Sequence, residues 1–192
     1  MVSVPSTMLK IGTSLPSFEL PDFEGTRVSS DGFTDEPVLV IFLCNHCPYV
    51  KNIAEKLGEK TTEYINKGVR VVGINSNDVE NYPADSPEKM KQFAQQHQFE
   101  FPYLYDESQE IAQKFKAACT PDIYLFNTDH ELVYRGQFDD SRPGNDIVPT
   151  GKDLTRAVEK MLNGEEIPEE NQQPSVGCNI KWKPGNAPEY FG

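Results

Sequence analysis

Two apolar runs mark the interior strands of this chain. Residues 38–43 (VLVIFL) and 69–75 (VRVVGIN) are mostly β-branched or apolar. This pattern is typical of strands in a parallel sheet, whose two faces are both buried. Between the runs, residues spaced as on one face of a helix indicate an amphipathic helix that ends at Gly68: Val50, Ile53, Ala54, Leu57, Thr61, Tyr64 and Ile65. A strand, a helix and a strand in this order predict a right-handed crossover between parallel strands.

Further elements are predicted on both sides of this unit. Alternating apolar and polar residues over 11–33 indicate a short β-hairpin before the first apolar run. FPYLYD predicts a short strand, and DIYLFN and ELVYRGQ, on either side of TDH, predict a second antiparallel hairpin. Helices are expected to start at Ser86, at a capping box over 106–109 and near Thr150, the last one ending at 163–164. Their expected buried residues are Met90, Phe93, Ala94, Ile111, Ala112, Phe115, Leu154, Val158, Met161 and Leu162.

The chain after residue 164 predicts an extended arm. Four prolines follow Glu165 and would break any helix. The arm still carries side chains that favour burial, including the only tryptophan: Cys178, Trp182, Tyr190 and Phe191. We therefore expect one α/β domain of residues 1–164 and a C-terminal arm of residues 165–192 that packs on it.

Length and charge exclude several classes of function. A chain of 192 residues is long enough for a single domain with a substantial core. Its formal net charge of −12 would repel phosphate backbones and anionic lipid, so nucleic acids and membranes are not expected partners. No apolar run approaches the ~20 residues of a membrane-spanning helix, and the start of the chain does not resemble a secretory signal. We therefore expect a cytoplasmic protein whose four cysteines are thiols or redox-active groups rather than structural disulfides.

The sequence CNHCPYV places two cysteines where the first strand leads into the helix. Ligands and chemistry collect at this end of the strands in open α/β sheets. Pro48 suits the first helical position, so Cys47 is expected at or next to the N-cap, facing unpaired N–H groups and the positive end of the helix dipole. This environment lowers a thiol pKa by about one unit, and a protonated His46 would strengthen the effect. Cys47, at the mouth of the fold, is therefore the predicted nucleophile.

Two other interpretations of the cysteine pair remain open. Cysteine is a small hydrophobic residue that often fills a core, and Cys44 at a strand end could do only that. A C-x-x-C pair can also form half of a zinc site, which would need Cys119, Cys178 or a histidine as further ligands. There is no second C-x-x-C, and a C-x-x-C beside a βαβ unit favours redox chemistry. We therefore expect no metal and no organic cofactor, because the sulfur atoms themselves carry the electrons.

Several longer motifs over residues 11–164 resemble one superfamily. IGTSLPSFELPDFEGTRVSSDGF and PEKMKQFAQQHQFEFPYLYDESQEIAQKFKAACTPDIYLFNTDHELVYRG are similar in order and spacing to thioredoxin-like redoxins, which include peroxiredoxins and TlpA-type thioredoxins. Within that superfamily, CNHCPYVK, CTPDIYLFN, YRGQFDDSRPGN and GCNIKWKPGN together most resemble the peroxiredoxin-like 1 group. The resemblance implies a thioredoxin-like fold, here with an N-terminal β-hairpin extension and an extended C-terminal arm.

The resemblance also implies roles for individual residues. In thioredoxin-like folds a cis-proline faces the reactive cysteine, so Pro121 and the preceding Thr120 would position the backbone of a partner peptide. Aligned with the WCPPC of TlpA-type proteins, Cys47 matches the attacking cysteine, and Cys44 is then the expected resolving partner. A register shifted by three residues would instead make CNHC an ordinary C-x-x-C. The expected start of the helix after Cys47 favours the first register.

A loop and a histidine complete the expected substrate-binding residues. By the same resemblance, the loop over residues 139–146 lies at the rim of the site. Arg142 in this loop would hold an anionic group of a partner, or would simply pair with Asp139 or Asp140. His46 is expected to contact the substrate.

The other two cysteines offer a redox relay. Cys119 precedes Thr120, and Cys178 lies on an arm that could reach the same face. A Cys119–Cys178 or a Cys47–Cys178 bridge would form a relay or a latch for the arm. The alternative is that both are buried thiols in a reducing compartment.

These observations favour thiol–disulfide oxidoreductase activity on a protein disulfide or a low-molecular-weight thiol. A weak peroxiredoxin-like peroxidase is the first alternative. The usual T-x-x-C of peroxiredoxins has Cys44 in place of threonine here, and Pro121 stands where they carry an arginine, so two groups that would polarise a peroxide are missing. A non-catalytic thioredoxin-fold binding module is the second alternative.

Overall fold

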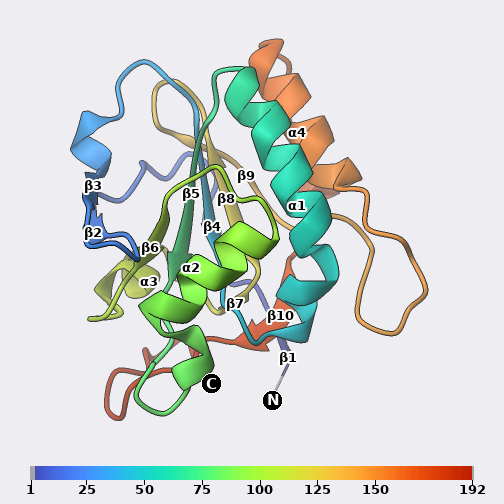
Figure 1. Cartoon of the computed structure of the whole chain (residues 1–192). Coiled ribbons are helices and arrows are strands. Elements are labelled where there is room, and N and C mark those ends of the chain that lie inside the picture. The colour runs from blue at the N-terminus through green and yellow to red at the C-terminus, as the bar shows by residue number, and fades with distance from the viewer. Residues whose placement is uncertain (1–2, 192) are drawn as a thin grey trace.

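The computed structural model describes residues 3–191, and its centre is a sheet of five strands in the order β6-β5-β4-β8-β9 (Figure 1). β4 pairs in parallel with β5, and β5 pairs in parallel with β6. β8 is antiparallel to β4, and β9 is antiparallel to β8. The crossover from β4 to β5 and the hairpin of β8 and β9 were both predicted, and both are confirmed. The strands are β4 (Val38–Phe42), β5 (Arg70–Asn75), β6 (Tyr103–Tyr105), β8 (Asp122–Phe126) and β9 (Leu132–Arg135).

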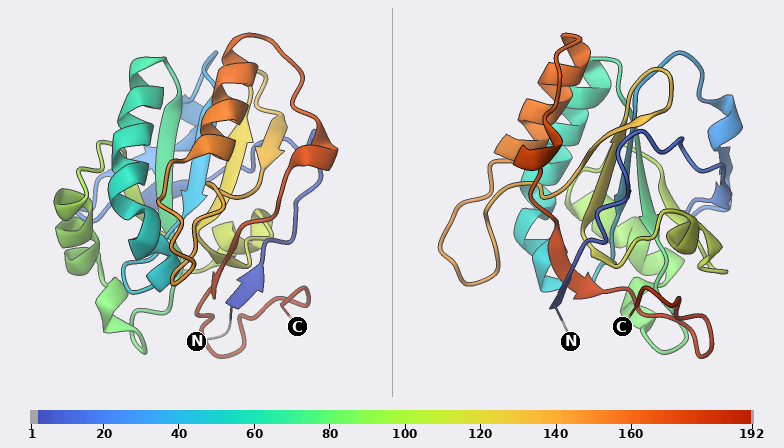
Figure 2. Two further views of the ribbon diagram at one scale, coloured as in Figure 1. Left: turned by 90° about the vertical axis from the view of Figure 1, so that its right-hand side faces the viewer. Right: turned by 180° about the vertical axis from the view of Figure 1, so that it is seen from behind.

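Three helices cover one face of this sheet. They are α1 (Pro48–Asn66), α2 (Pro87–Gln96) and α4 (Lys152–Leu162). Figures 1 and 2 show α1 and α4 running side by side on this face. Alternate residues of β4 point toward them, because side chains along a strand point to opposite faces. The resulting core includes Leu39, Ile41, Val50, Leu57, Met90, Leu154 and Val158, together with three of the cysteines.

The opposite face of the sheet is covered by α3 (Glu110–Lys114) and by N-terminal residues. The predicted N-terminal hairpin is present, with β2 (Glu19–Pro21) antiparallel to β3 (Arg27–Ser29). Val38, Val40 and Phe42 of β4 point to this face. They form a second core together with Phe18, Leu20, Phe33, Phe115, Tyr124 and Phe126. β4 is therefore buried on both sides, as its unbroken apolar run predicted.

A second, smaller sheet joins the two ends of the chain. Its order is β1-β10-β7, all antiparallel, with β1 (Ser3–Pro5), β10 (Val176–Asn179) and β7 (Cys119–Thr120). Figure 2 shows β1 in dark blue beside β10 in red in both views. The C-terminal segment therefore packs on the rest of the chain through a strand, as well as through Trp182, which is partly buried against the second core. Residue 192 of the predicted arm lies outside the described residues.

Two local predictions were wrong in part or in full. The capping box over 106–109 was expected to open a helix that buries Ile111, Ala112 and Phe115. These residues are buried, and the Asp106 carboxylate accepts from the N–H groups of Ile111 and Ala112, but α3 begins only at Glu110, after Gln109 in the left-handed region (φ 65°). The side chain of Gln109 donates to the carbonyls of Ser76 and Lys181 instead of turning back to the helix start. Leu162 was expected to be buried, but it lies at the last position of α4 and is exposed. Gln109 is therefore directed by its contacts with distant segments, whereas Leu162 is exposed because the helix ends there.

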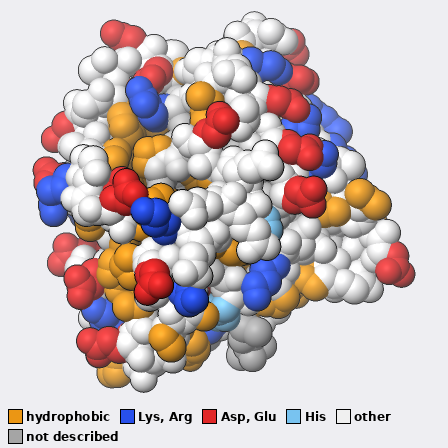
Figure 3. Space-filling model, in the orientation of Figure 1, with side chains coloured by type: hydrophobic (Ala, Val, Ile, Leu, Met, Phe, Trp, Pro, Cys, Tyr) orange, Lys and Arg blue, Asp and Glu red, His pale blue; other side chains and the backbone are white. Residues whose placement is uncertain are grey.

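Figure 3 shows acidic and basic side chains interspersed over one face. Among the helices of residues 3–191, none has both the length and the apolar character required to span a bilayer.

Candidate active site

The end of β4 and the start of α1 place two cysteines side by side in the core. Cys47 is the N-cap of α1, and Pro48 occupies the first helical position, as the sequence predicted. Cys44 lies two residues after the end of β4, and its sulfur lies 3.2 Å from Thr120 Oγ1. The Cys47 sulfur lies 3.1 Å from the carbonyl oxygen of Thr120. Thr120 therefore contacts both cysteines, one through its side chain and one through its backbone.

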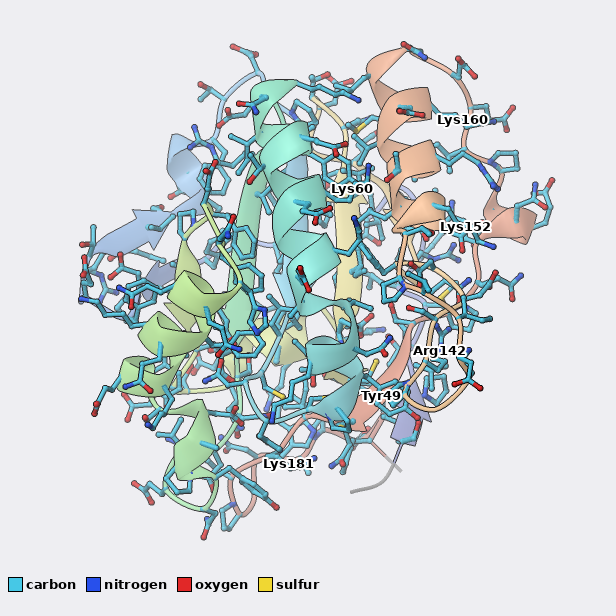
Figure 4. All side chains as sticks on the ribbon, turned by 45° about the vertical axis from the view of Figure 1, so that its right-hand side comes forward. Tyr49, Lys60, Arg142, Lys152, Lys160 and Lys181 are labelled. Carbon is cyan, nitrogen blue, oxygen red and sulfur yellow. The ribbon has the colours of Figure 1, made fainter. Side chains whose placement is uncertain are left out.

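Thr120 is held at this place by β7 and by the peptide bond that follows it. The bond between Thr120 and Pro121 is cis, as the resemblance implied. Beside Pro121, Tyr49 and Arg142 line a shallow hollow together with Val176 of β10. Figure 4 shows Tyr49 at the first turn of α1 and Arg142 in the neighbouring loop, both near β10.

A third cysteine completes the group. The thiol of Cys178 on β10 hydrogen-bonds to the sulfur of Cys47. Cys119, in contrast, has its sulfur 3.5 Å from the carbonyl oxygen of Pro121 and 4.0 Å from that of Ser175. All four cysteines lie within the described residues, and none is in a disulfide. The structure thus brings Cys44, Cys47 and Cys178 together, whereas the contacts of the Cys119 sulfur are with backbone carbonyl groups.

The three sulfur atoms differ sharply in acidity. Hydrogen bonds with the thiols of Cys178 and Cys44 lower the pKa of Cys47 well below the usual range, and the backbone N–H of Val50 in the first helical turn acts in the same direction. Burial raises the pKa of Cys44, and the hydrogen bond to Cys47 raises the pKa of Cys178. Burial also raises the pKa of Cys119. Among these thiols, Cys47 is therefore the one that loses its proton most readily.

The expectation that Cys47 lies at an open mouth was wrong. Its exposed fraction is 0%, and those of Cys44 and Cys178 are 1% and 2%. The covering element is β10, which the local pattern around CNHC could not indicate because it lies far along the chain. A reagent therefore reaches Cys47 only when the residues that cover it move.

A buried carboxylate that sequence reasoning missed fixes the loop between β4 and α1. Asp85 is fully buried at the end of a short 3₁₀ helix (Pro83–Asp85). It accepts hydrogen bonds from the backbone N–H groups of Asn45 (2.7 Å) and His46 (3.3 Å) and from Asn77 Nδ2 (2.8 Å). His46 Nδ1 lies 2.6 Å from its second oxygen. Asp85 lies between Pro83 and Pro87, a local pattern that is typical of a turn. The residues around it therefore do not indicate that it binds the loop before α1.

The two predicted substrate-binding side chains make other contacts. His46 pairs with Asp85 and stacks on the ring of Tyr82, with a side-chain exposure of 19%. Arg142 does not pair with the carboxylate of either neighbouring aspartate; its guanidinium donates to the carbonyls of Asp139 and Ser141 and to Gln137 Oε1. It therefore holds its own loop together beside the hollow at Pro121.

One group of potential metal ligands occurs among residues 3–191. Ligand atoms of Cys44, His46 and Asp85 lie within 4.8 Å of one another. The Asp85 carboxylate already accepts hydrogen bonds from the loop and from Asn77, so a metal would have to displace them. The group includes neither Cys119 nor Cys178, which the zinc interpretation had offered as further ligands.

Comparison with known proteins agrees with this architecture. The α/β thioredoxin-like fold, with extra strands at both ends of the chain and a cysteine at the start of α1, defines the class of thioredoxin-like redoxins. Residues 11–135 match the model of the AhpC/TSA family, and the chain belongs to that family. The predicted fold class and superfamily are therefore confirmed.

Two sequence relatives carry different activities in their names. The thiol-disulfide oxidoreductase ResA of Bacillus thuringiensis subsp. konkukian is 22% identical over 125 residues, which cover 65% of this chain and 68% of the relative. Peroxiredoxin Bcp of Escherichia coli K12 is 32% identical over 108 residues, which cover 56% of this chain and 64% of the relative. The family therefore includes both thiol-disulfide oxidoreductases and peroxiredoxins.

Two solved structures are similar over nearly the whole chain. An uncharacterized conserved protein of Geobacillus kaustophilus is 47% identical with a TM-score of 0.92, covering 96% of this chain and 98% of that one. A hypothetical protein of Sinorhizobium meliloti 1021 is 42% identical with a TM-score of 0.91, covering 94% of this chain and 99% of that one. Neither protein's name states an activity.

Proposed function

We propose that this protein is a thiol oxidoreductase in which Cys47 is the reacting sulfur and Cys44 the resolving one. The observation that carries the proposal is the position of Cys47 at the N-cap of α1, with Thr120 against Cys44 and Cys47 and the Cys178 thiol beside Cys47; these thiol contacts also lower the pKa of Cys47. A thiolate is the nucleophile in disulfide exchange, and a neutral thiol beside it is available for the second step.

The exchange has two steps. The Cys47 thiolate attacks one sulfur of a substrate disulfide, forming a mixed disulfide and releasing the first substrate thiolate. The Cys44 thiol then loses its proton and attacks the Cys47 sulfur, which forms a Cys44–Cys47 disulfide and releases the second substrate thiolate. The substrate is reduced by two electrons, and the protein is oxidised by two. Thr120 lies against both sulfur atoms and would orient them through both steps.

A thiol peroxidase is the second candidate, and the enclosure of Cys47 favours it. A hydroperoxide is small enough to reach a covered sulfur more readily than a protein disulfide. The Cys47 thiolate would attack the terminal peroxide oxygen, giving a sulfenic acid and water or an alcohol once a proton is taken up. The Cys44 thiol would then displace water from the sulfenic acid and form the same disulfide. Peroxiredoxin Bcp, at 32% identity, also supports this candidate.

Alkylation over a pH series, followed by mass spectrometry, tests the proposal. The rate at Cys47 is expected to stay nearly constant from about pH 5 to about pH 8, since the thiolate is already formed, whereas the rate at Cys119 rises with pH. After mild oxidation, Cys44 and Cys47 are expected in one disulfide, with Cys119→Ser as the matched control that leaves it intact. Equal rates and equal pH profiles at all four cysteines would instead identify a non-catalytic binding module.

Substrate turnover separates the two candidate activities. Reduction of a small disulfide that requires both Cys47 and Cys44 identifies an oxidoreductase. Consumption of hydrogen peroxide that is lost in Cys47→Ser but persists for a first turnover in Cys44→Ser identifies a peroxidase, because only the first step needs Cys47 alone.

A further inference from the structure

The strand that covers Cys47 is held against β7 by its backbone. Cys178 stands opposite Thr120, and Asn179 opposite Cys119, in an antiparallel register. The N–H of Ile180, just beyond β10, donates to the carbonyl of Ala118 at 3.0 Å. β7 thus offers its free edge to an extended segment, and β10 fills that edge. Pairing of an added strand with a free edge is a common way for a protein to bind a peptide.

Gly177 allows β10 to come this close. A Cβ atom at this position would lie 2.0 Å from the carbonyl oxygen of Thr120, 2.6 Å from its carbonyl carbon and 3.2 Å from the nitrogen of Pro121. These are backbone atoms, so they cannot turn aside. Any residue with a side chain would therefore have to stand further from β7. The next residue, Cys178, places its thiol on Cys47.

We propose that β10 is an internal peptide ligand of the Cys47 site, which must leave before an extended segment of a protein disulfide can bind there. The inference rests on the proposed function and deepens it by naming two substrate classes. With β10 in place, the exposed fraction of Cys47 is 0%, so only peroxides or small disulfides that enter through local fluctuations would reach it. With β10 displaced, the edge of β7 accepts the backbone of a partner, and the sulfur of the partner takes the place of the Cys178 thiol.

The arrangement of the small sheet makes such a displacement local. β10 shares three register pairs with β1 but only two with β7. β1 and β10 can therefore lift together, retaining their own pairing while the pairing with β7 and the hydrogen bond between Cys178 and Cys47 are lost. The segment on both sides of β10 stays anchored, through Ser175 Oγ to the carbonyl of Gly136 (2.6 Å) and through the N–H of Lys181 to Asn77 Oδ1 (2.8 Å). Local openings of this kind occur well below the free energy of global unfolding.

Substitution of Gly177 tests the proposal. Gly177→Ala adds one methyl group that β7 cannot accommodate, so β10 is expected to leave more often. The rate at which a bulky maleimide conjugate labels Cys47 should rise about tenfold or more. Gly32→Ala is the matched control, because a Cβ there meets nothing within 4 Å, and it should label like the wild-type protein. A folded Gly177→Ala variant that labels no faster than the control would overturn the proposal.

A measurement on the wild-type protein keeps the proposal testable if Gly177→Ala does not fold. The labelling rate of Cys47 is followed at urea concentrations below the unfolding transition. Displacement of β10 exposes little surface, so the logarithm of the rate should depend on urea much more weakly than global unfolding does. Labelling that follows the urea dependence of global unfolding contradicts the proposal, because Cys47 would then be reached only in the unfolded chain.

Turnover separates this inference from the proposed function. Reduction of the disulfides of insulin, a protein substrate, is expected to be faster with Gly177→Ala than with Gly32→Ala, while reduction of a small disulfide changes much less. If small disulfides are reduced but Gly177→Ala gains no rate with insulin, the proposed function stands and the inference fails. If maleimide labelling rises but no disulfide is reduced by either variant, strand displacement stands and the exchange activity fails.

Discussion

Asp85 gives a sharp test of how the candidate site is built, because one side chain holds the whole loop between β4 and α1. In Asp85→Ala the N–H groups of Asn45 and His46, the imidazole of His46 and the amide of Asn77 lose their acceptor together. These groups lie in the interior, so water does not readily replace the carboxylate. The variant removes no apolar contact of the core clusters.

The size of the effect follows from the donors left behind. A buried donor without an acceptor costs about 1–3 kcal/mol. Several donors lose their acceptor at once, so we expect Asp85→Ala to lower the free energy of unfolding by about 3–5 kcal/mol. Asp85→Asn keeps one carbonyl oxygen as an acceptor, so its loss should be smaller.

Urea unfolding followed by circular dichroism measures both variants at equilibrium. Asp129→Ala is the control, because Asp129 lies exposed in the turn between β8 and β9 and its removal should change stability by less than about 0.5 kcal/mol. The maleimide labelling rate of Cys47 is measured in parallel, and it should rise in Asp85→Ala as the loop that precedes α1 loosens. A loss of stability no larger than that of the control would refute the role given to Asp85.

Three further predictions concern the scaffold. Burial raises the pKa of Asp122 to about 6, above its unfolded value of 3.8, so the stability conferred by its protonation is complete below about pH 4 and is lost as pH rises through about 6. Between pH 4 and pH 7 the wild-type protein should lose about 3 kcal/mol of unfolding free energy through Asp122, and Asp122→Asn should not show this loss. The same loss in both proteins would contradict the prediction. Gly58→Ala places a Cβ 2.1 Å from the carbonyl oxygen of His97, which should lower the free energy of unfolding by about 1–3 kcal/mol and therefore lower the Tm in thermal unfolding. An equal or higher Tm would count against this packing of α1 on α2. Phe115→Ala removes a ring that contacts those of Phe42, Tyr124 and Phe126, which should cost about 3–5 kcal/mol in urea unfolding; a cost below 1 kcal/mol would show that the second core is not closely packed.

The local elements and the position of Cys47 within them could be predicted from short-range patterns in the chain. The apolar runs predicted β4 and β5, and the helical spacing after CNHC predicted α1. Pro48 and the start of that spacing placed Cys47 at the N-cap, as observed. These features depend on residues within a few positions of one another, so periodicity and capping rules are sufficient to predict them.

The surroundings of Cys47, in contrast, depend on contacts between distant parts of the chain. Asp85 and Cys178 reach the loop and the sulfur from elements distant in the sequence, and β10 closes the site that the sequence had placed at an open mouth. The pairing of β10 with β7 depends on the edge that the folded domain leaves free. It also depends on Gly177, because the Thr120 backbone lies where a side chain at position 177 would stand. Local patterns indicate which face of an element is buried, but they do not indicate which distant segment covers it.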